Sequence, residues 1–322
     1  METKLLYLFT RTPLHVGAGS SVGAIDQPII RERHTGFPII PASSLKGSFA
    51  DQWPTGFKND KEQQARMKTR KENGKVIVEE TSEAAWLFGS DEAGDALAAA
   101  GAILLGEARL LAFPIRSAKG SFAWITCPLL LFRAARDGVI ADTLIPVLPS
   151  DNDGDGKALF LKSGPLALGD KVVLEEYTFT HTGGDEDKFK DLGAALSKVV
   201  AKDPVWTGVA SRLVILSDGQ MSFFANTACE VAQHVRISDE TGTADPGGLF
   251  NQENVPSETL FYAVIRADKS RLRGEAYKGT QHSAKTADDA LAAFAAKVGE
   301  KGVFQFGADA STGLGYCTVR LA

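Results

Sequence analysis

Apolar and polar residues alternate in several stretches of this chain, which is the pattern of half-buried β-strands. Within residues 4–16, Leu6, Leu8 and Leu14 share one parity. Pro13 predicts a bend or a sheet edge there, because proline cannot donate a ladder hydrogen bond. Similar strand patterns occur at 102–112, 122–133, 209–217, 229–238, 259–267, 303–306 and 316–321. The chain is therefore predicted to form an extensive sheet.

Apolar residues at helical spacing occur between these strands. Ser43 or Ser44 can cap a helix that carries Leu45, Phe49 and Trp53 on one face. Further helices are predicted at 82–89, 91–100, 185–202 and 286–298, the last one capped by Thr286. This combination is typical of an α+β fold with an antiparallel sheet and helices on one of its faces, and not of a doubly wound fold.

Two long segments interrupt the pattern. Residues 58–75 carry seven Lys or Arg against three acids. They indicate a basic insertion, taken as 54–80, that is mobile or forms a solvated helix. Residues 238–258 form a second, irregular insertion rich in polar residues and glycine.

Composition and charge narrow the class of protein. The chain has 322 residues, of which 44% are hydrophobic, so dominant disorder is excluded. A formal net charge of −5 excludes a globally basic nucleic-acid-binding protein but not a local basic patch. Three widely spaced cysteines exclude a disulfide framework and favour a reducing, cytoplasmic location. We recognise no secretory signal and no apolar run of the ~20 residues that a membrane span needs, so no membrane association is expected.

Two glycine-rich loops are candidate sites of chemistry. The loop Gly17–Gly23 lacks the spacing of dinucleotide-binding and Walker loops, which makes a nucleotide-dependent metabolic enzyme the least favoured class. It is either a wide connection or a platform that brings backbone N–H groups and Asp26 against phosphates. In the closing loop, Gly307, Gly313 and Gly315 permit close approach of the backbone to RNA phosphates. Lys46 in the first turn of its helix is either solvated or shares an anion with the helix N-terminus.

Several motifs in collinear order resemble one known family. They are TPLHVGAGSSVGAIDQPIIRERHTGFPIIPASSLKG, LFGS, IRSAKGSFAWITCPLLLFR, DETGTADPGGLF with the PSETLFYAVI that follows, and GADASTGLG. Together they are similar to the RAMP superfamily and, within it, to the backbone subunits of the type III-B, or Cmr, CRISPR effectors. The resemblance spans the chain from end to end.

The resemblance implies a single RAMP domain over residues 1–322. Its expected fold is a ferredoxin-like, RRM-related palm with large insertions and a protruding β-hairpin thumb, here 238–258. Copies would stack into a helical filament along a guide crRNA and cleave complementary target RNA at regular intervals, with a divalent metal, Mg²⁺ or Mn²⁺. The expected partners are crRNA, target RNA, other copies of the chain, and the other Cmr subunits, namely the large polymerase-like subunit, the small subunit and other RAMP subunits.

The resemblance also implies roles for individual residues. Asp26 matches the cleavage aspartate and is the expected metal ligand, and His15 lies at the position of a histidine near the cut. Ser43, Ser44, Lys46 and Gly47 match the helix that grips the guide. Leu249 and Phe250 match wedges against unstacked bases. Independently of the resemblance, Lys119 and the glycines of the closing loop are expected RNA contacts, and Arg31 is either part of a surface patch or a phosphate contact. Relatives often carry acidic and tyrosine residues after Phe250, whereas this chain has Asn251–Asn254, so Glu253 is the nearby carboxylate expected to assist.

Asp26 has few acidic neighbours in the sequence, which disfavours a two-metal nuclease. We expect the RNA's own 2′-hydroxyl to attack, with Asp26 acting through a metal ion or orienting that hydroxyl. His15 is either a general acid or base, or a strand histidine held by hydrogen bonds. Two alternatives stay open at this point, a non-catalytic crRNA-binding scaffold and a guide-processing RAMP endoribonuclease.

Overall fold

The computed structural model describes the whole chain except residues 1, 20–22, 54, 59–60, 91–96 and 148–155. Its helices are α1 (Ala42–Ala50), α2 (Glu83–Phe88), α3 (Pro128–Arg136), α4 (Glu186–Ser197), α5 (Val209–Arg212), α6 (Asp218–Thr227) and α7 (Ala287–Lys301). Short 3₁₀ turns lie at Asp142–Leu144, Trp206–Gly208, Glu275–Tyr277 and Ala310–Thr312. No described helix is long and apolar enough to cross a membrane.

The strands form one large sheet and several small ones. They are β1 (Glu2–Thr10), β2 (Ile39–Ile40), β3 (Phe57–Lys58), β4 (Gln64–Ala65), β5 (Met67–Glu72), β6 (Lys75–Thr81), β7 (Gly89–Ser90), β8 (Ala99–Ala100), β9 (Ile103–Leu105), β10 (Ala108–Arg116), β11 (Phe122–Thr126), β12 (Lys157–Ala158), β13 (Lys171–Leu174), β14 (Tyr177–His181), β15 (Leu213–Ile215), β16 (Glu230–Ile237), β17 (Ala244–Asn254), β18 (Leu260–Ala267), β19 (Val303–Gln305) and β20 (Tyr316–Leu321).

The large sheet has nine strands, seven of them in the order β15-β11-β10-β18-β1-β20-β19; in addition, β2 pairs with β10 and β9 pairs with β18. Its pairs are antiparallel except β11 with β15. The α+β class with a predominantly antiparallel sheet is therefore confirmed. The N-terminal strand ends at Thr10, before Pro13, in keeping with the break that proline predicts.

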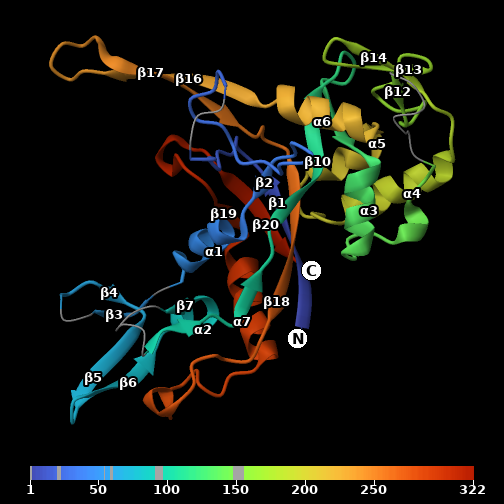
Figure 1. Cartoon of the computed structure of the whole chain (residues 1–322). Coiled ribbons are helices and arrows are strands. Elements are labelled where there is room, and N and C mark those ends of the chain that lie inside the picture. The colour runs from blue at the N-terminus through green and yellow to red at the C-terminus, as the bar shows by residue number, and fades with distance from the viewer. Residues whose placement is uncertain (1, 20–22, 54, 59–60, 91–96, 148–155) are drawn as a thin grey trace.

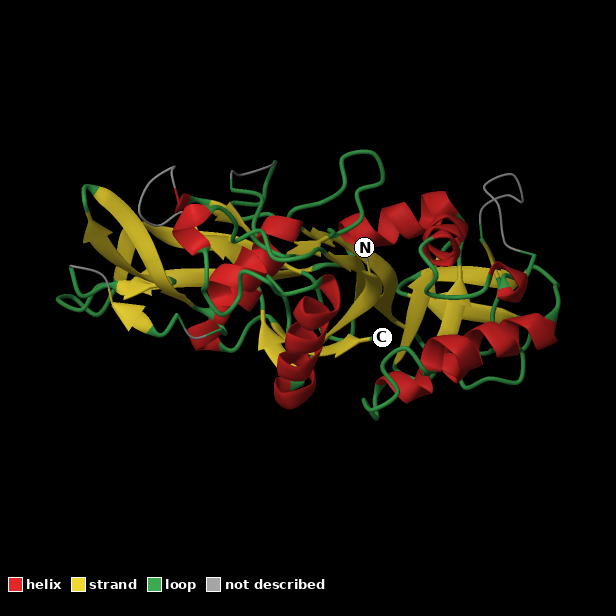
Figure 2. Ribbon diagram, turned by 90° about the horizontal axis from the view of Figure 1, so that it is seen from below, coloured by secondary structure: helices red, strands yellow, loops and turns green. Residues whose placement is uncertain are grey.

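Helices cover both faces of this sheet, so the prediction of helices on one face is wrong. Leu6 and Leu8 point into a core that includes Phe49 of α1 and Phe294 of α7. Residues of the opposite parity, Tyr7 and Phe9, point into a second core built from α3, α4 and Trp206. Figure 1 shows α1, α2 and α7 on one side of the strands and α3, α4 and α5 on the other, and Figure 2 gives the view from below. The sequence of β1 explains this, because side chains on both faces of the strand are apolar and each face needs a cover.

Several local predictions are confirmed. Helix α2 begins after its N-cap Ser82, and α4 lies within the predicted amphipathic segment 185–202. Helix α7 begins at a capping box made by Thr286 and Asp289. Strands β18, β19 and β20 match their predictions closely.

Other local predictions are wrong, each for a specific reason. The predicted strand 122–133 ends at Thr126, because Pro128 starts α3 at its first position. The first residues of the predicted strand 209–217 form α5. Helix α1 has Pro41 as its N-cap and no side-chain cap, so neither Ser43 nor Ser44 caps it. Of the predicted helix 91–100, residues 91–96 lie outside the described residues, and Ala99–Ala100 form β8.

The basic segment is not a solvated helix. Its described residues form the pair β3–β4 and the hairpin β5–β6. Asn73 and Gly74 are the two residues of the hairpin turn, and both have positive φ, as a type I′ turn requires. Residues 54 and 59–60 lie outside the described part of this segment, and its mobility stays a prediction.

The segment 238–258 is not irregular. Strand β17 pairs with β16 in an antiparallel ladder from Glu230↔Asn254 to Ile237↔Ala244. The resulting hairpin starts at Glu230 and not at residue 238, and it protrudes from the top of the molecule (Figure 1).

Candidate functional site

The base of the β16–β17 hairpin is held by loop segments along the edge of β17 that faces away from β16. Gln27 donates its N–H to the carbonyl of Asn251 (3.1 Å) and accepts from the N–H of Glu253 (2.9 Å). Leu14 and Val255 exchange two backbone hydrogen bonds of 2.8 and 2.9 Å. Because these bonds satisfy the edge of β17, the loop between Leu14 and Gln27 is fixed to the hairpin at both of its ends.

Asp26 lies in this loop, exposed, and is paired with Asn251 of β17. The N–H of Asp26 donates to Oδ1 of Asn251 (2.8 Å), and Oδ2 of Asp26 accepts from the N–H of Asn251 (2.9 Å). The amide group of Asn251 also donates to the carbonyl of Ala24 (3.0 Å). Asn251, which the sequence marked only as a departure from the family pattern, thus positions Asp26. Residues 26 and 251 are 225 positions apart, so no local sequence pattern links them.

His15 is buried, with 5% of its surface exposed, and is bonded to the same strand edge. Its Nδ1 lies 2.7 Å from the carbonyl oxygen of Glu253. A carbonyl only accepts, so Nδ1 carries the proton and Nε2 has the lone pair in the neutral ring. A Cβ at Gly17 would lie 3.0 Å from Nε2, so this nitrogen lies beside the glycine loop.

Asp26 and His15 are thus tied to positions two residues apart on one strand. Such positions are separated by about 7 Å along an antiparallel strand. The segments that carry Asp26 and His15 are therefore held next to each other at the base of the hairpin. This arrangement can orient a hydroxyl and accept or supply a proton.

Glu253 and Arg31 form a buried ion pair under this edge. Their Oε1 and Nη2 atoms are 2.5 Å apart, and Oε2 of Glu253 accepts from the N–H of Ile29 (3.0 Å). Nη1 of Arg31 donates to the carbonyls of Gly36 (2.8 Å) and Ala225 (2.7 Å). Both side chains are occupied in joining the loop, α6 and β17, which argues against a catalytic role for Glu253 and an RNA contact by Arg31.

The closing loop packs against His15 from the other side. The N–H of Ala308 donates to the carbonyl of His15 (2.9 Å). Gly307 has φ +75°, and a Cβ there would overlap that same carbonyl oxygen. At Gly315, a Cβ would overlap the carbonyl oxygen of Phe306, whereas at Gly313, with φ +89°, it would meet no atom within 4 Å. The fold itself therefore requires glycine at positions 307 and 315, whether or not RNA binds there.

Helix α1 presents a small polar surface near this loop. Ser43, Lys46 and Gly47 are exposed at helical spacing i, i+3, i+4, and Ser44 is half-buried. A Cβ at Gly47 would meet nothing within 4 Å. The helix is joined to the closing loop through Phe49 and Phe306, whose rings are 5.3 Å apart. No acidic residue lies in its first turn.

The remaining predicted residues lie farther along the chain. Leu249 on β17 is 69% exposed. Phe250 stacks on His234 across the hairpin, with ring centroids 5.1 Å apart. Lys119 lies in the turn between β10 and β11, where its Nζ donates to the carbonyl of Ala167 (2.6 Å). The structure therefore does not join Lys119 to the hairpin base by any contact among the described residues.

The donor set does not form a protein cage for a metal ion. Among the described residues, no group of three or more His, Cys, Asp or Glu could hold one. Asp26 has one carboxylate oxygen bonded to Asn251, and the oxygens of Glu253 are bonded to Arg31 and Ile29. Of these two carboxylates, Asp26 is the one that keeps an oxygen for a metal ion.

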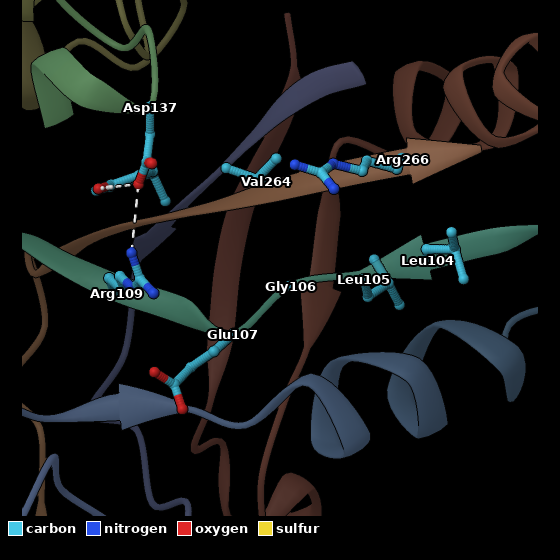
Figure 3. A pocket seen from close by; sticks show the side chains of 9 residues that line it. Leu104, Leu105, Gly106, Glu107, Arg109, Asp137, Val264 and Arg266 are labelled. Carbon is cyan, nitrogen blue, oxygen red and sulfur yellow. Dashed lines mark hydrogen bonds and ion pairs between the residues drawn. The ribbon is translucent and has the colours of Figure 1, made fainter. Parts of the chain in front are cut away.

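A separate pocket of about 450 Å³ lies on the large sheet between β9, β10 and β18 (Figure 3). Asp137 accepts there from the hydroxyl of Tyr262 (2.9 Å) and pairs with Arg109 (3.4 Å). Burial raises the pKa of the Glu107 carboxyl, with a smaller contribution from Glu32. Two arginines and two carboxylates line this pocket, namely Arg109, Arg266, Glu107 and Asp137. Its charges therefore favour neither an anionic nor a cationic ligand.

Known proteins confirm the class of the chain. The model of the RAMP superfamily matches residues 8–318. The chain is 32% identical over 270 residues to the CRISPR system Cmr endoribonuclease Cmr4 of Pyrococcus furiosus, covering 82% of this chain and 81% of that protein. The chain therefore belongs to the RAMP superfamily, in the family of the Cmr4 proteins.

Solved structures share the fold. The crystal structure of oligomeric Cmr4 from Pyrococcus furiosus matches with a TM-score of 0.64 at 24% identity, covering 100% of this chain and 99% of that chain. A chain of the type III-B Cmr-β complex bound to cognate target RNA matches with a TM-score of 0.63 at 20% identity, covering 100% and 97%.

The role of Gly307 in holding His15 gives a stability test. Gly307→Ala should destabilise the fold by at least about 2 kcal/mol, because the new Cβ combines a positive φ with an overlap on the His15 carbonyl. Gly313→Ala, with positive φ but open space around it, is the matched control and should cost only about 1 kcal/mol. Urea unfolding of both variants measures the difference. Equal losses would contradict the packing of the closing loop on His15.

Proposed function

We propose that this chain is a backbone subunit of a type III-B CRISPR effector, which assembles along a crRNA and cleaves complementary target RNA. The family relation and the name of its Pyrococcus furiosus relative, an endoribonuclease, support this proposal. The observation that carries it is the attachment of Asp26 to the base of a protruding hairpin through Asn251. A hairpin that displaces a target nucleotide would thereby bring its sugar to the carboxylate.

In this proposal the large sheet is the ferredoxin-like, RRM-related palm and β16–β17 is the thumb. The chain acts as one domain over residues 1–322, and 54–80 is an insertion into it. Leu249, exposed on the hairpin, and Phe250, stacked on His234, offer apolar surface to unstacked bases. A net charge of −5 is compatible with RNA binding, because a filament adds up many weak contacts along one strand.

The chemistry that suits this site is attack by the RNA's own 2′-hydroxyl. Its oxygen forms a bond to the adjacent phosphorus, the bond from phosphorus to the 5′-oxygen breaks, and the products are a 2′,3′-cyclic phosphate and a 5′-hydroxyl. Asp26 accepts a hydrogen bond from the 2′-hydroxyl and holds it in line with the phosphate. Nε2 of His15, which has the lone pair, accepts the proton that the 2′-hydroxyl loses, and the leaving 5′-oxygen takes a proton from water. Glu253 acts here only as a positioning residue for Arg31 and Ile29.

A divalent metal is part of the proposal, although the described protein donors do not form a cage for one. Mg²⁺ or Mn²⁺ bound at this site would have Asp26 as its protein ligand, with RNA phosphates and water completing its shell. The other proposed partners are target RNA, further copies of the chain, and the large, small and other RAMP subunits of the complex. We propose a cytoplasmic location for this assembly.

Asp26→Asn should abolish cleavage of a guide-matched RNA, lowering the rate by about 10²-fold or more. The one oxygen of the new amide stays on the N–H of Asn251, so the group left for the 2′-hydroxyl is an NH₂, which cannot accept a hydrogen bond from it. Guide binding should be unchanged, since the hydrogen bonds to Asn251 can be kept. Electrophoresis of labelled target in the assembled complex measures the rate, and the product ends identify the route. Asp51→Asn, at an exposed carboxylate after α1, is the control. Undiminished cleavage by Asp26→Asn would favour the non-catalytic scaffold, and 3′-hydroxyl ends would exclude attack by the 2′-hydroxyl.

Removal of divalent ions tests the metal. Excess EDTA should stop cleavage, and Mg²⁺ or Mn²⁺ should restore it, while the fold is unaffected because no described cluster of protein ligands depends on the ion. Cleavage rate and the circular dichroism spectrum are followed in parallel. Full activity in EDTA would remove the metal from the proposal and leave the 2′-hydroxyl route in place.

Lys46→Ala should weaken guide binding and reduce its salt dependence, because one cation fewer then displaces ions from the RNA. The slope of log K against log salt should fall by about 0.7 per bound copy. Lys188→Ala, on the distant helix α4, is the matched control and should leave the slope unchanged. Fluorescence anisotropy with a labelled guide measures both. The same slope for Lys46→Ala and the unaltered chain would show that α1 does not contact the guide.

A further inference from the structure

Asp26, Asn251 and Gln233 lie in one row across the base of the β16–β17 hairpin. A parallel bridge joins Gln27 to Gln252. The residues that precede these two, Asp26 and Asn251, therefore lie side by side, in agreement with their hydrogen bonds. On the other side of β17, Asn251 is in register with Gln233 of β16. Because side chains in register on neighbouring strands project to the same face, the row occupies one face of the hairpin base.

Asn251 and Gln233 form a non-hydrogen-bonded pair, the kind in which opposed side chains lie closest. The N–H of Asn251 donates to Oδ2 of Asp26 (2.9 Å), and its carbonyl accepts from the N–H of Gln27 (3.1 Å). Both backbone groups of Asn251 thus face the loop and not β16. The Cβ atoms of such a pair are about 4.5–5.5 Å apart. Gln233 therefore lies directly beside the residue that holds Asp26.

The side chain of Gln233 is exposed, and its amide has no hydrogen bond among the described residues. The amide of Asn251, in contrast, is bonded on both sides, to the N–H of Asp26 and to the carbonyl of Ala24. The neighbours of Gln233 on this face are apolar and at least half exposed, namely Val231, Val235 and Leu249. A free amide group surrounded by apolar side chains therefore stands beside the proposed cleavage aspartate.

The proposed cleavage reaction needs a hydrogen-bond donor at this place. Attack of the 2′-oxygen on phosphorus adds negative charge to the non-bridging oxygens of the phosphate, and donors fixed beside such charge lower the barrier. Asp26 and His15 act on the 2′-hydroxyl and not on these oxygens. The guanidinium of Arg31 is already bonded to Glu253 and to two backbone carbonyls. The amide of Gln233 is a donor that remains available.

We propose that Gln233 is a catalytic residue of the cleavage step, whose Nε2–H donates to a non-bridging oxygen of the phosphate under attack. The bond from the 2′-oxygen to phosphorus forms and the bond from phosphorus to the 5′-oxygen breaks. No proton passes to or from Gln233. Its hydrogen bond strengthens as the phosphate gains charge, so it stabilises the transition state more than the bound target. This assignment rests on the proposed function, because it needs the cleavage reaction.

Gln233→Met tests the donor, because it removes both amide N–H groups and keeps the length of the side chain. In the complex assembled on a guide, single-turnover cleavage of matched target should slow by about 10²-fold, as for the loss of one preorganised donor. Target affinity should stay within about threefold, because the bond matters mainly in the transition state. Gln233→Glu, which has the same length but no N–H donor, should be at least as slow. Electrophoresis measures the rate, and filter binding measures the affinity.

Phosphorothioate targets show whether Gln233 contacts the phosphate itself. Sulfur replaces either non-bridging oxygen at the cleaved position, and it is a weak hydrogen-bond acceptor. One of the two diastereomers should be cleaved about tenfold more slowly than the other by the unaltered chain. In Gln233→Met this difference should shrink to within about twofold, because the donor that senses the sulfur is gone. A purely structural effect of the substitution would leave the difference unchanged.

The matched control is Gln64→Met, at an exposed glutamine on β4, which should leave the rate, the affinity and the diastereomer difference unchanged. Cleavage by Gln233→Met at the unaltered rate overturns the assignment, and so does a loss of target affinity as large as the loss of rate. In both cases cleavage that still depends on Asp26 leaves the proposed function standing. An unaltered complex that binds guide but never cleaves matched target overturns the assignment and the proposed cleavage together.

Discussion

The hydrogen bonds along the outer edge of β17 are the constraint on which the site depends. An edge strand leaves a row of N–H and C=O groups that must find partners. Here Leu14, His15, Asp26 and Gln27 supply those partners, and each bond is 2.7–3.1 Å long. The glycine loop is thereby attached at both ends to the hairpin. A displacement of the hairpin base would move the carboxylate of Asp26 with it.

A buried polar layer supports this edge from below. Gln252, Glu253 and Asn254 are nearly inaccessible, and Gln252 donates to Asn254 (3.1 Å) and to Asp309 of the closing loop (2.9 Å). Breaking a buried pair such as Arg31–Glu253 costs about 3–5 kcal/mol, because it leaves a charge without a partner. Residues 251–254 thus form the support of the site in this chain.

Charge is distributed unevenly over the molecule. Exposed Asp239 and Glu240 lie at the tip of the β16–β17 hairpin, and exposed Lys71 and Lys75 lie beside the turn of the β5–β6 hairpin. Figure 1 shows these two hairpins well apart, with α1, the helix that carries Lys46, between them. The net charge of −5 does not show that acidic and basic residues lie in different parts of the molecule. In the assembly of copies proposed above, the position of each charge relative to its neighbours would matter more than the total.

The sequence by itself determined the α+β class, the amphipathic helices α4 and α7, the closing strands and the family, because these follow from local periodicity, capping residues and collinear motifs. It singled out Asp26, His15 and Lys46 but not what holds them. The pairing of Asp26 with Asn251, the burial of Glu253 against Arg31 and the second covered face of the sheet depend on residues far apart in the chain. The Asn73-Gly74 pair is a sequence signal for a two-residue type I′ turn, but the basic residues around it led to the prediction of a mobile or solvated helical segment. Only the tertiary structure decided these contacts. A hydrogen bond forms between groups that are close in space, and the spacing of residues along the sequence does not show which distant groups come close.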